Sequence, residues 1–287
     1  MSRPQLHCYG CGRAARVILR WLYQADLIQI GQICNRSLES SRDAVTFMGA
    51  GQAVSAMDAA VNGGWLMLGL PDGALNAAAL GLSCRMPGQP ELVFHLSGSM
   101  PASVLEPLGA PVAAVHPVRA FADPAIAVAA MPGTWCVGEG ETGALSRLKA
   151  LFCAAGARWM EIAPAGKPAY HAATVAASNY LVALNDMACS LALCSGLDRN
   201  HAAELLADLQ QAVIESLRTV SPEQALTGPI ERGDEQALAR LLPAVDAAGH
   251  ADLFRALGRA TLNLAQRKRG EFDSDAALAL ALTSRRD

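Results

Sequence analysis

The sequence predicts a doubly wound α/β domain with a mainly parallel sheet, followed by an all-helical domain. Over the first 164 residues, short apolar runs alternate with stretches of helical periodicity. Most of these runs are continuously apolar, which is typical of strands that are covered on both faces. After Pro164-Ala165-Gly166 the pattern is helical to the last residues. We therefore divide the chain into residues 1–164 and residues 165–287.

The first domain is predicted element by element from these patterns. Residues 13–23 place Ala14, Val17 and Leu22 on one face, so we expect the first helix there. Ser37 is a suitable N-cap for a helix that ends near residue 48. Further helices are expected at residues 72–83, with Asp72 in the capping position, and at residues 141–155. Strands are expected at residues 5–9, 27–34, near 54, 65–70, 91–96, 112–115, 134–137 and 158–162.

The second domain begins with an unusually long apolar segment. Residues 167–195 are expected to form one helix, and Gly196 ends it. Its apolar side chains leave no wide polar face, which predicts a helix that is buried nearly all round. In a domain this small, such a helix suggests the core of a homodimer. Shorter helices are expected at residues 200–219, 234–242, 250–268 and 273–282.

A glycine-rich turn follows the first predicted strand and opens the first helix. The segment Gly10-Cys11-Gly12-Arg13-Ala14-Ala15 fits the dinucleotide-binding pattern G-x-G-x-x-G/A. The first glycine permits a tight turn, and the second lets the backbone approach a pyrophosphate. The free N–H groups of the helix N-terminus then face the phosphates. The turn therefore predicts a nucleotide-binding site.

Polar and turn residues follow several of the predicted strands. In open parallel sheets, ligands bind outside the carboxyl ends of the strands. We therefore expect these residues to line the cofactor site together with the glycine turn. They are Asn35, Arg36 and Ser37 after the second strand, Leu70, Pro71 and Asp72 after the fourth, and Ser97 with Gly98 after the fifth.

The end of the second strand indicates which dinucleotide is bound. An NAD site usually offers Asp or Glu to the ribose hydroxyl, whereas an NADP site offers Arg to the 2′-phosphate. Asn35-Arg36-Ser37 contains no acid, so we favour NADP, with NADPH as the reduced form. The alternative is an ordinary polar loop that caps a helix.

Candidates for proton transfer lie mainly in the long helix. Lys167, His171, Thr174 and Ser178 are spaced for one helical face, and Asn179 lies beside it. His171 or Lys167 can give a proton to a carbonyl or imine as hydride arrives, while Ser178 or Asn179 holds the substrate. The alternative is that Lys167 is solvated and the other residues bond locally.

Other histidines are also candidates or are explained by the fold. His116 follows the sixth strand and is the second acid/base candidate; the alternative is a strand-end histidine that takes no part in chemistry. His7 and His95 lie within strands, and we expect both to be buried and hydrogen-bonded. No metal site is predicted, because no histidine cluster supports the formal C-x-x-C of Cys8 and Cys11.

Composition narrows the class of protein. The chain has 287 residues, 52% of them hydrophobic and 17% charged, with a net charge of −3. This balance argues against nucleic acid as a partner. Residues 172–197 are interrupted by Asn179, Asn185 and Asp186, so no membrane span is predicted. With no visible leader and eight scattered cysteines, we expect a cytoplasmic protein.

Together these motifs resemble a largely uncharacterised family of Rossmann-like proteins with an all-helical C-terminal domain, related to pyrroline-5-carboxylate reductase and the deazaflavin-dependent NADP reductases. The resemblance covers nearly the whole chain. It implies NADP binding, a dimerising helical domain and a reductase activity. It also implies that Thr227, Gly228 and Pro229 line the active-site cleft, in the same subunit or the partner's. The matching segments are Gly10-x-Gly12, Asn35-Arg36-Ser37, Leu70-Pro71-Asp72, Ser97-Gly98, His116-Pro117, Tyr170-His171, Ser178-Asn179-Tyr180, Leu226-Thr227-Gly228-Pro229 and Arg232-Gly233-Asp234.

Two classes of function fit these observations. The first is an NADP-dependent oxidoreductase that transfers hydride between NADP(H) and a small carbonyl, imine or hydroxy-acid substrate. The second is a non-catalytic NADP-binding sensor or partner-binding module. Chemistry like that of prephenate or hydroxyacid dehydrogenases shares the same architecture. The sequence names neither the substrate nor the direction of the reaction.

Overall fold

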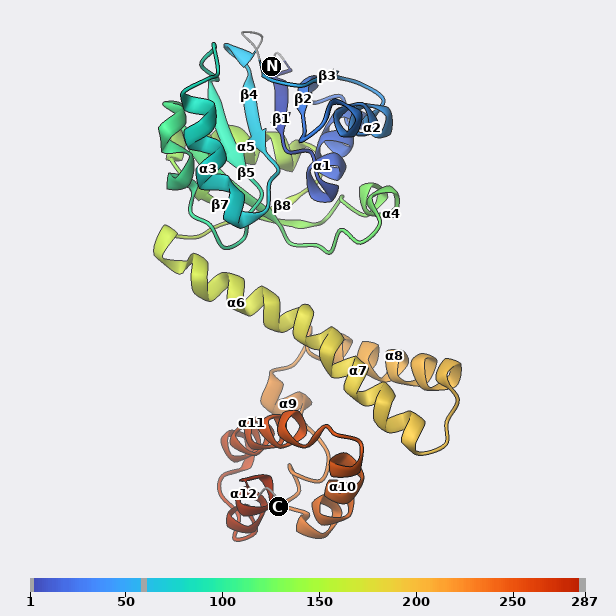
Figure 1. The fold of residues 1–287 in the computed structure, drawn as a ribbon. Coiled ribbons are helices and arrows are strands. Elements are labelled where there is room, and N and C mark those ends of the chain that lie inside the picture. Colours follow the sequence, from blue (N-terminus) through green and yellow to red (C-terminus); the bar gives the residue numbers. More distant parts are fainter. Residues whose placement is uncertain (1–2, 58–60, 284–287) are drawn as a thin grey trace. The chain divides into compact units, whose positions relative to one another are not determined.

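The computed structural model describes residues 3–57 and 61–283, which form two compact units, residues 1–175 and residues 176–287 (Figure 1). The division falls inside a helix, eleven residues beyond the boundary expected from the sequence. Each unit has hydrophobic core residues of its own. None of the described helices combines the length and apolar character that crossing a membrane requires.

The first unit is built on an eight-stranded sheet in the order β3-β2-β1-β4-β5-β6-β7-β8. Strands β1 to β6 are parallel, whereas β7 runs antiparallel to β6 and parallel to β8. This is the mainly parallel sheet that the sequence predicts. The strands are β1 Gln5–Tyr9, β2 Gln29–Cys34, β3 Gln52–Val54, β4 Trp65–Leu68, β5 Leu92–His95, β6 Val112–Pro117, β7 Trp135–Gly140 and β8 Arg158–Glu161.

Helices cover both faces of this sheet, as a doubly wound fold requires. One core joins α1 and α5 to alternate strand residues such as Leu6 and Phe94, and the other joins α3 to Leu66 and Val93. The helices of this unit are α1 Arg13–Gln24, α2 Leu38–Met48, α3 Asp72–Ser83, α4 Pro124–Ala129 and α5 Thr142–Ala154, with 3₁₀ turns η2 Ala102–Leu108 and η3 Pro164–Gly166.

One large side chain is accommodated by two glycines, one on β2 and one directly before β4. His7 of β1 is fully buried, and its Nδ1 accepts a hydrogen bond from the Gln32 N–H at 3.0 Å. A Cβ at Gly31 would lie 2.6 Å from the His7 ring, and one at Gly64 would lie 2.8 Å from it. The expectation of a buried, hydrogen-bonded His7 is therefore confirmed, and the ring occupies a slot between two glycines.

The rest of the chain is helical, as predicted, but the expected long helix is interrupted. Ser178 has φ −121° and ψ −72°, so α6 ends before it and α7 begins after it. The Ser178 hydroxyl donates to Asn179 Oδ1 at 3.0 Å, and such local bonds compete with the helical pattern. The helices are α6 Lys167–Ala177, α7 Asn179–Cys194, α8 Arg199–Ser216, α9 Pro222–Ala225, α10 Glu235–Ala247, α11 Ala251–Arg269 and α12 Asp275–Thr283.

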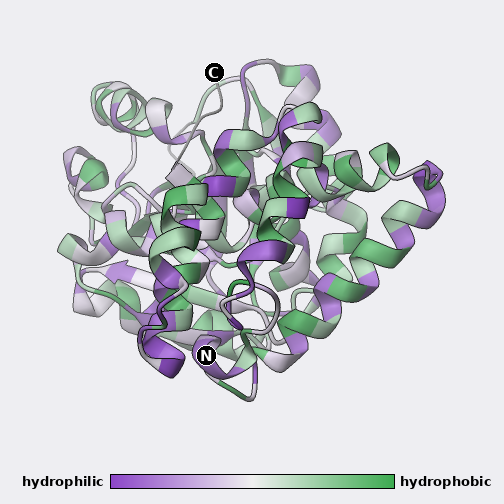
Figure 2. Cartoon of the chain, turned by 90° about the horizontal axis from the view of Figure 1, so that it is seen from below, coloured by the Kyte–Doolittle hydropathy of each residue, from purple (hydrophilic) through white to green (hydrophobic). Residues whose placement is uncertain are grey.

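The prediction that this helical segment is buried nearly all round is wrong for the single chain. Within α7 the described side chain of Met187 is buried, whereas Tyr180 is 66% exposed and Val182 is 71% exposed. Hydrophobic and hydrophilic residues alternate along the helices (Figure 2). The core of the second unit lies instead between α10, α11 and α12, where Leu238 and Leu262 are buried.

Candidate functional site

The glycine turn has the tight geometry that its sequence predicts. Gly10 has φ +80°, and a Cβ there would lie 2.2 Å from a methyl group of Leu70. Its N–H donates to the Cys34 carbonyl oxygen at 2.8 Å, which ties the turn to the end of β2. A Cβ at Gly69 would lie 2.3 Å from the Gly10 oxygen. The backbone therefore passes close to the ends of β2 and β4, where side chains other than hydrogen would not fit.

The N-terminus of α1 is open beside this turn. The N-cap residue is Gly12, and among the described residues no side-chain cap bond is formed there, so the first N–H groups of α1 keep their ability to bind an anion. A Cβ at Gly12 would have no neighbour closer than 3.6 Å, and the Gly12 and Arg13 residues are exposed, with Ala14 half-buried. The helix start therefore has both the donors and the space that a phosphate group needs.

The three polar residues after β2 have different surroundings. Asn35 Oδ1 accepts from the Cys11 N–H at 2.5 Å, and Asn35 Nδ2 donates to the Ser40 carbonyl at 2.9 Å. Ser37 caps α2 by accepting from the Ser40 N–H, as predicted. Asn35 and Ser37 are thus engaged in supporting the loop. Arg36 is exposed and forms no ion pair or hydrogen bond with the part of the chain that the structure describes.

Asp72 does not cap α3, contrary to the sequence-based expectation. Pro71 is the N-cap residue, and Asp72 is the first residue of the helix. Its carboxylate instead accepts a hydrogen bond from the Ser99 hydroxyl, which lies after β5. Burial would raise the pKa of Asp72, but hydrogen bonds from Ser99 and Ser97 outweigh it and hold the pKa below its usual value. Asp72 therefore joins two strand ends at one edge of the sheet.

The segment after β5 is folded around a buried histidine. His95 Nδ1 accepts from the Ser97 N–H at 3.1 Å, and His95 Nε2 lies 3.2 Å from the Pro101 carbonyl oxygen. The Ser97 hydroxyl accepts from the N–H groups of Ser99 and Met100. The expectation of a buried, hydrogen-bonded His95 is confirmed. These bonds shape the loop that carries Ser97 and Gly98.

Lys167 is held in place by a buried acid. Its Nζ lies 3.5 Å from Glu139 Oε2 and donates to the Ser97 carbonyl oxygen at 3.2 Å. Both charged side chains are 3% exposed, so the ammonium group is not solvated at the helix start. Burial lowers the pKa of Lys167, although Glu139 opposes the change. Glu139 also accepts from the Ala102 N–H at 2.8 Å. The pair thus links α6, β7 and the loop after β5.

Three rings gather beside Gly98, where β6 ends and α6 begins. His116 Nδ1 lies 2.6 Å from the Tyr170 hydroxyl, and the His116 and His171 ring centroids are 6.3 Å apart. A Cβ at Gly98 would lie 2.9 Å from His171 Nδ1 and 3.0 Å from the His116 ring. Glycine at position 98 therefore lets both imidazoles approach the loop backbone.

The electrostatics of this cluster favour neutral groups. Burial, His171 and Lys167 lower the pKa of His116 to about 4. Burial raises the pKa of Tyr170 to about 12. His171 Nδ1 is buried and has no hydrogen-bond partner among the described residues. The cluster thus offers a neutral imidazole, a phenol and an imidazole nitrogen that a further group can satisfy.

The remaining predicted site residues belong to the helical unit. Ser178 and Asn179 lie at the break before α7, so the helical spacing that linked them to Lys167 does not hold. Thr227 is exposed, and Gly228 and Pro229 follow it in the loop between α9 and α10. The Lys268 ammonium donates to the Leu226 carbonyl at 2.8 Å, which fixes the start of this loop on α11.

Sequence reasoning did not select Glu139 or Tyr170 as functional residues. Glu139 is an acid within the strand Trp135–Gly140, and a carboxylate in an otherwise apolar strand is the signal that could have marked it. Tyr170 directly precedes His171, and the sequence pattern alone assigns it no role of its own. Its partner His116 is 54 residues away, a pairing that spacing does not reveal.

Comparison with known proteins agrees with this architecture. Residues 134–261 match a domain family described as a domain of unknown function, DUF2520. The match runs from the region of β7 into α11 and includes Glu139, Lys167, Tyr170 and His171. No curated protein matches the chain significantly.

Several solved structures have a similar fold. A protein from Thermotoga maritima is 23% identical with a TM-score of 0.70, over 92% of this chain and 99% of that one. A reductive aminase from Aspergillus terreus, in complex with NADPH and ethyl levulinate, is 18% identical with a TM-score of 0.65, over 97% and 99%. A pyrroline-5-carboxylate reductase from Coxiella burnetii is 16% identical with a TM-score of 0.56, over 93% and 99%.

At these identities the likeness concerns the fold, and it extends over nearly the full length of each chain. The chain thus has a Rossmann-like α/β fold followed by a helical part, and its residues 134–261 match the DUF2520 family model.

Proposed function

We propose that this protein is an NADP-dependent oxidoreductase that transfers hydride between NADP(H) and a small carbonyl, imine or hydroxy-acid substrate. The observation that carries the proposal is the Gly10–Gly12 turn, which lies beside the uncapped N-terminus of α1 at the carboxyl end of β1. This arrangement matches the pyrophosphate site of doubly wound folds. The likeness in fold to a reductive aminase solved with NADPH supports the same reading.

The residues around the turn fit this cofactor. Gly10, Cys11, Gly12, Arg13 and Ala14 form the phosphate-binding turn, and Leu70 packs over it. Arg36 is exposed and unpaired among the described residues, so its guanidinium is available to a 2′-phosphate. No acid stands beside it in Asn35-Arg36-Ser37. We therefore assign NADP(H) rather than NAD(H). When bound, the cofactor supplies or accepts the hydride.

The polar cluster at the other strand ends supplies the proton in this proposal. Lys167 is committed to Glu139 and Ser97, so we assign it to holding the start of α6 rather than to proton transfer. His171 is the cluster imidazole whose Nδ1 has no partner among the described residues, so we assign the proton transfer to it. Tyr170, held by His116, positions the substrate oxygen or nitrogen. Such a polar group set favours an enzyme over a non-catalytic sensor.

The cofactor assignment is tested by exchanging Arg36. Arg36→Asp should weaken NADPH binding by about a hundredfold and leave NADH binding within a few-fold, because only NADPH carries the 2′-phosphate. Isothermal titration of both dinucleotides measures this. Lys149→Asp is the matched control, since it makes the same charge change at an exposed position on α5. Equal losses for NADPH and NADH, or no binding of either by the native protein, would refute the assignment.

Turnover is tested by following NADPH consumption with small keto acids, aldehydes and cyclic imines. We expect one of these classes to be reduced by the native protein. His171→Gln should then abolish turnover while NADPH affinity stays within about twofold, because the imidazole acts on the substrate and not on the phosphates. A His171→Gln variant with native turnover would remove the proton-transfer role.

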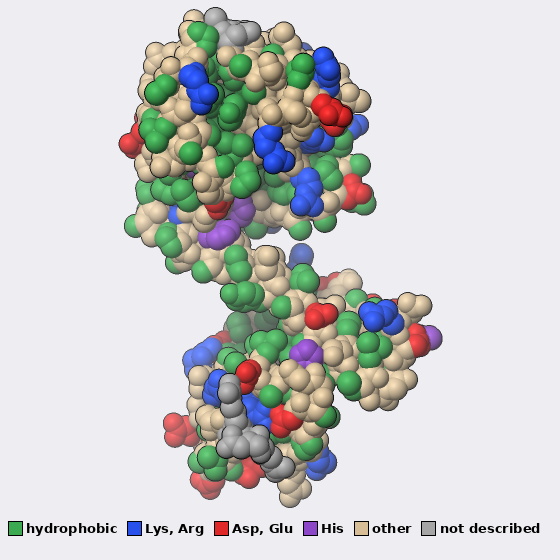
Figure 3. Space-filling model, in the orientation of Figure 1, with side chains coloured by type: hydrophobic (Ala, Val, Ile, Leu, Met, Phe, Trp, Pro, Cys, Tyr) green, Lys and Arg blue, Asp and Glu red, His purple; other side chains and the backbone are tan. Residues whose placement is uncertain are grey.

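We also propose that the helical unit pairs with a second copy of the chain. Large apolar side chains are exposed on α7 and α8, among them Val182 at 71%, Leu205 at 55% and Leu209 at 59%. Hydrophobic side chains are visible across this unit in Figure 3. Soluble monomers rarely expose contiguous apolar patches. Light scattering should give a dimer that Leu209→Asp dissociates and the control Leu280→Asp on α12 does not; a native monomer would contradict the proposal.

A further inference from the structure

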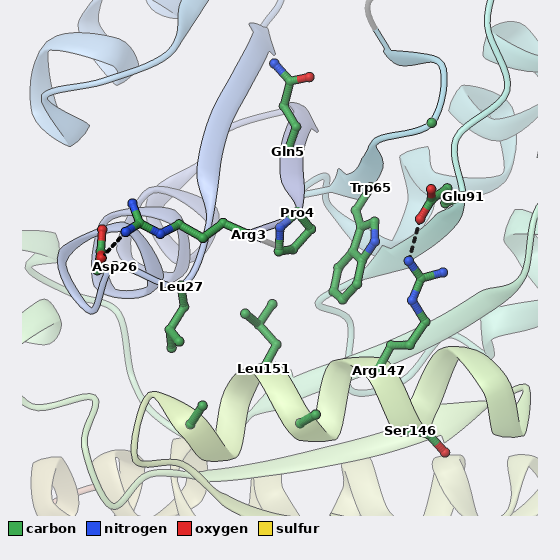
Figure 4. A pocket seen from close by; sticks show the side chains of 13 residues that line it. Arg3, Pro4, Gln5, Asp26, Leu27, Trp65, Glu91, Ser146, Arg147 and Leu151 are labelled. Atoms are coloured by element: carbon green, nitrogen blue, oxygen red, sulfur yellow. Dashed lines mark hydrogen bonds and ion pairs between the residues drawn. The ribbon is translucent and has the colours of Figure 1, made fainter. Parts of the chain in front are cut away.

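A cavity lies at the opposite edge of the sheet from the glycine turn. It has a volume of about 800 Å³ and is lined by the N-terminal ends of β1 and β4 and by one face of α5. All of its lining residues belong to the first unit, and Figure 4 shows them around a common space. This volume lies in the range of small-molecule sites. None of the roles assigned above uses it.

The walls of the cavity are mainly apolar. Trp65, Leu27 and Leu151 face it from three different segments (Figure 4). Ala150 and Ala154 also line it and leave room along α5. Pro4 extends this surface at the start of β1. A flat aromatic wall with small neighbours suits a ligand that contains a ring.

Trp65 brings an unsatisfied donor to this wall. The residue is 6% exposed, and its indole Nε1 is buried with no hydrogen-bond partner among the described residues. A buried polar group without a partner is unfavourable for the folded protein. The Arg147 guanidinium lies 4.9 Å from the indole centroid, and in Figure 4 the nitrogen-bearing edge of the ring is on the Arg147 side. An acceptor that displaces Arg147 slightly would therefore meet both the indole N–H and the guanidinium.

Two arginines that line the cavity, Arg3 and Arg147, have N–H donors that their ion pairs do not use. Arg147 contacts Glu91 through one nitrogen at 2.5 Å, and Arg3 contacts Asp26 through one nitrogen. A guanidinium carries five N–H groups, so each arginine keeps several for which the described residues supply no acceptor. The Arg147 and Glu91 side chains are 43% and 51% exposed. Exposed pairs of this kind are weak, so Arg147 can turn toward a ligand.

We propose that this cavity binds a small aromatic monocarboxylate, with the ring against Trp65 and the carboxylate accepting from Arg147 and the Trp65 indole. The planar guanidinium matches the two oxygens of a carboxylate. Glu91 and Asp26 balance the two arginines, so multiply charged anions such as phosphates are disfavoured. The site is separate from the proposed dinucleotide site and does not depend on it.

The test uses the indole N–H signals of the full-length protein in ¹⁵N-labelled form. The chain has four tryptophans, and the Trp65 signal is the one that Trp65→Phe removes. Phenylacetate should shift this signal saturably, and uncharged 2-phenylethanol should bind at least tenfold more weakly. Arg147→Gln should weaken phenylacetate binding about tenfold, because a charge-assisted hydrogen bond is lost.

The chain offers a matched control for Arg147. Arg158 lies 3.9 Å from the Trp135 ring centroid, so Arg158→Gln removes an arginine from over a tryptophan elsewhere in the same unit. Phenylacetate affinity should be unchanged in this variant and in the presence of saturating NADPH. Native-like indole signals from the tryptophans that the exchanged arginine does not contact show that each variant is folded.

Three results would overturn the proposal. The first is a Trp65 signal that phenylacetate leaves unmoved or moves no more than 2-phenylethanol does. The second is an equal loss of affinity in Arg147→Gln and Arg158→Gln. The third is competition by NADPH, which would assign phenylacetate to the dinucleotide site. The proposed oxidoreductase function is judged separately by NADPH titration, so failure of one leaves the other standing.

Discussion

At the scale of single residues, burial sets the protonation state of the histidines near the strand ends. His95 is fully buried, and burial lowers its pKa to about 4. His95 Nδ1 accepts a hydrogen bond from the Ser97 N–H, so this nitrogen must stay unprotonated. A charged imidazole would carry its second proton on the same nitrogen and lose the bond. His116 is likewise neutral near pH 7, since its pKa is also lowered to about 4. Both rings favour the folded state only while they stay uncharged.

The first unit should therefore lose stability in mildly acidic solution. A histidine whose pKa falls from 6.5 to about 4 on folding contributes stability that is present above pH 6.5 and lost as the pH falls toward 4. At pH 5 the loss is about 2 kcal/mol for each such group. The free energy of unfolding of the native protein should fall between pH 7.5 and pH 5, and His95→Gln should make that fall smaller by about 2 kcal/mol.

Urea unfolding followed by tryptophan fluorescence measures this effect, because Trp21, Trp65, Trp135 and Trp159 all lie in the first unit. His201→Gln is the control, since His201 is exposed on α8. The same acid loss in His95→Gln and in the native protein would show that His95 is not the group that titrates.

Some properties of single residues could be predicted from the sequence, and others could not. The glycines of the turn, the Ser37 cap and the burial of His7 and His95 could be predicted, because each depends on local pattern or strand periodicity. The partner of Asp72 could not, because Ser99 reaches it only after β4 and β5 pair in the sheet. The Asp72 side chain could cap α3 or accept a hydrogen bond from Ser99, and in the folded protein it accepts from Ser99.

At the scale of elements, the buried Lys167–Glu139 pair joins α6 to β7. Removing one member of such a pair leaves an uncompensated charge in a buried place, which costs about 3–5 kcal/mol. Lys167→Met should therefore destabilise the first unit strongly. The double variant Lys167→Met, Glu139→Gln should recover most of the loss, because no lone charge remains.

The tryptophan signal in urea again provides the measurement, and the double-mutant cycle isolates the pair. A double variant that is as unstable as the two single losses added together would mean that the charges do not depend on one another. In that case Lys167 would act through packing, and its assigned role at the start of α6 would be withdrawn.

The ends of an element could be predicted where they follow from the apolar pattern on one face. They could not be predicted where a single local hydrogen bond interrupts a helix, as at Ser178. The periodicity of residues 167–195 continues smoothly through Ser178, yet the backbone leaves the helical region there. The direction of a strand could not be predicted either, because an apolar run such as Trp135–Gly140 has the same pattern in a parallel or an antiparallel pair. The fold class could still be predicted, because it depends on the order of strands and helices along the chain.

At the scale of the whole molecule, the chain has separate hydrophobic cores in its two units. The first contains two clusters, one on each face of the sheet, and the second is centred on Leu238, Leu262, Leu278 and Leu282. We therefore expect two unfolding transitions in calorimetry. NADPH at about a hundred times its dissociation constant should stabilise the first unit by about 2.7 kcal/mol.

That stabilisation corresponds to a shift of about 5–10 °C in the transition of the first unit. Calorimetry identifies this transition by comparison with tryptophan fluorescence on the same samples. The transition of the helical unit should stay in place. Equal shifts of both transitions, or a single transition throughout, would mean that the units unfold as one body.

The histidine slot on β1 has a consequence for how the sheet tolerates change. Gly31 and Gly64 leave the room that the His7 ring occupies, so the three positions share one volume across neighbouring strands. Adding a methyl group at either glycine is compatible with the fold only when residue 7 becomes smaller. A variant library that alters these positions one at a time would find all three intolerant, whereas exchanging them together keeps the packed volume and the strand spacing.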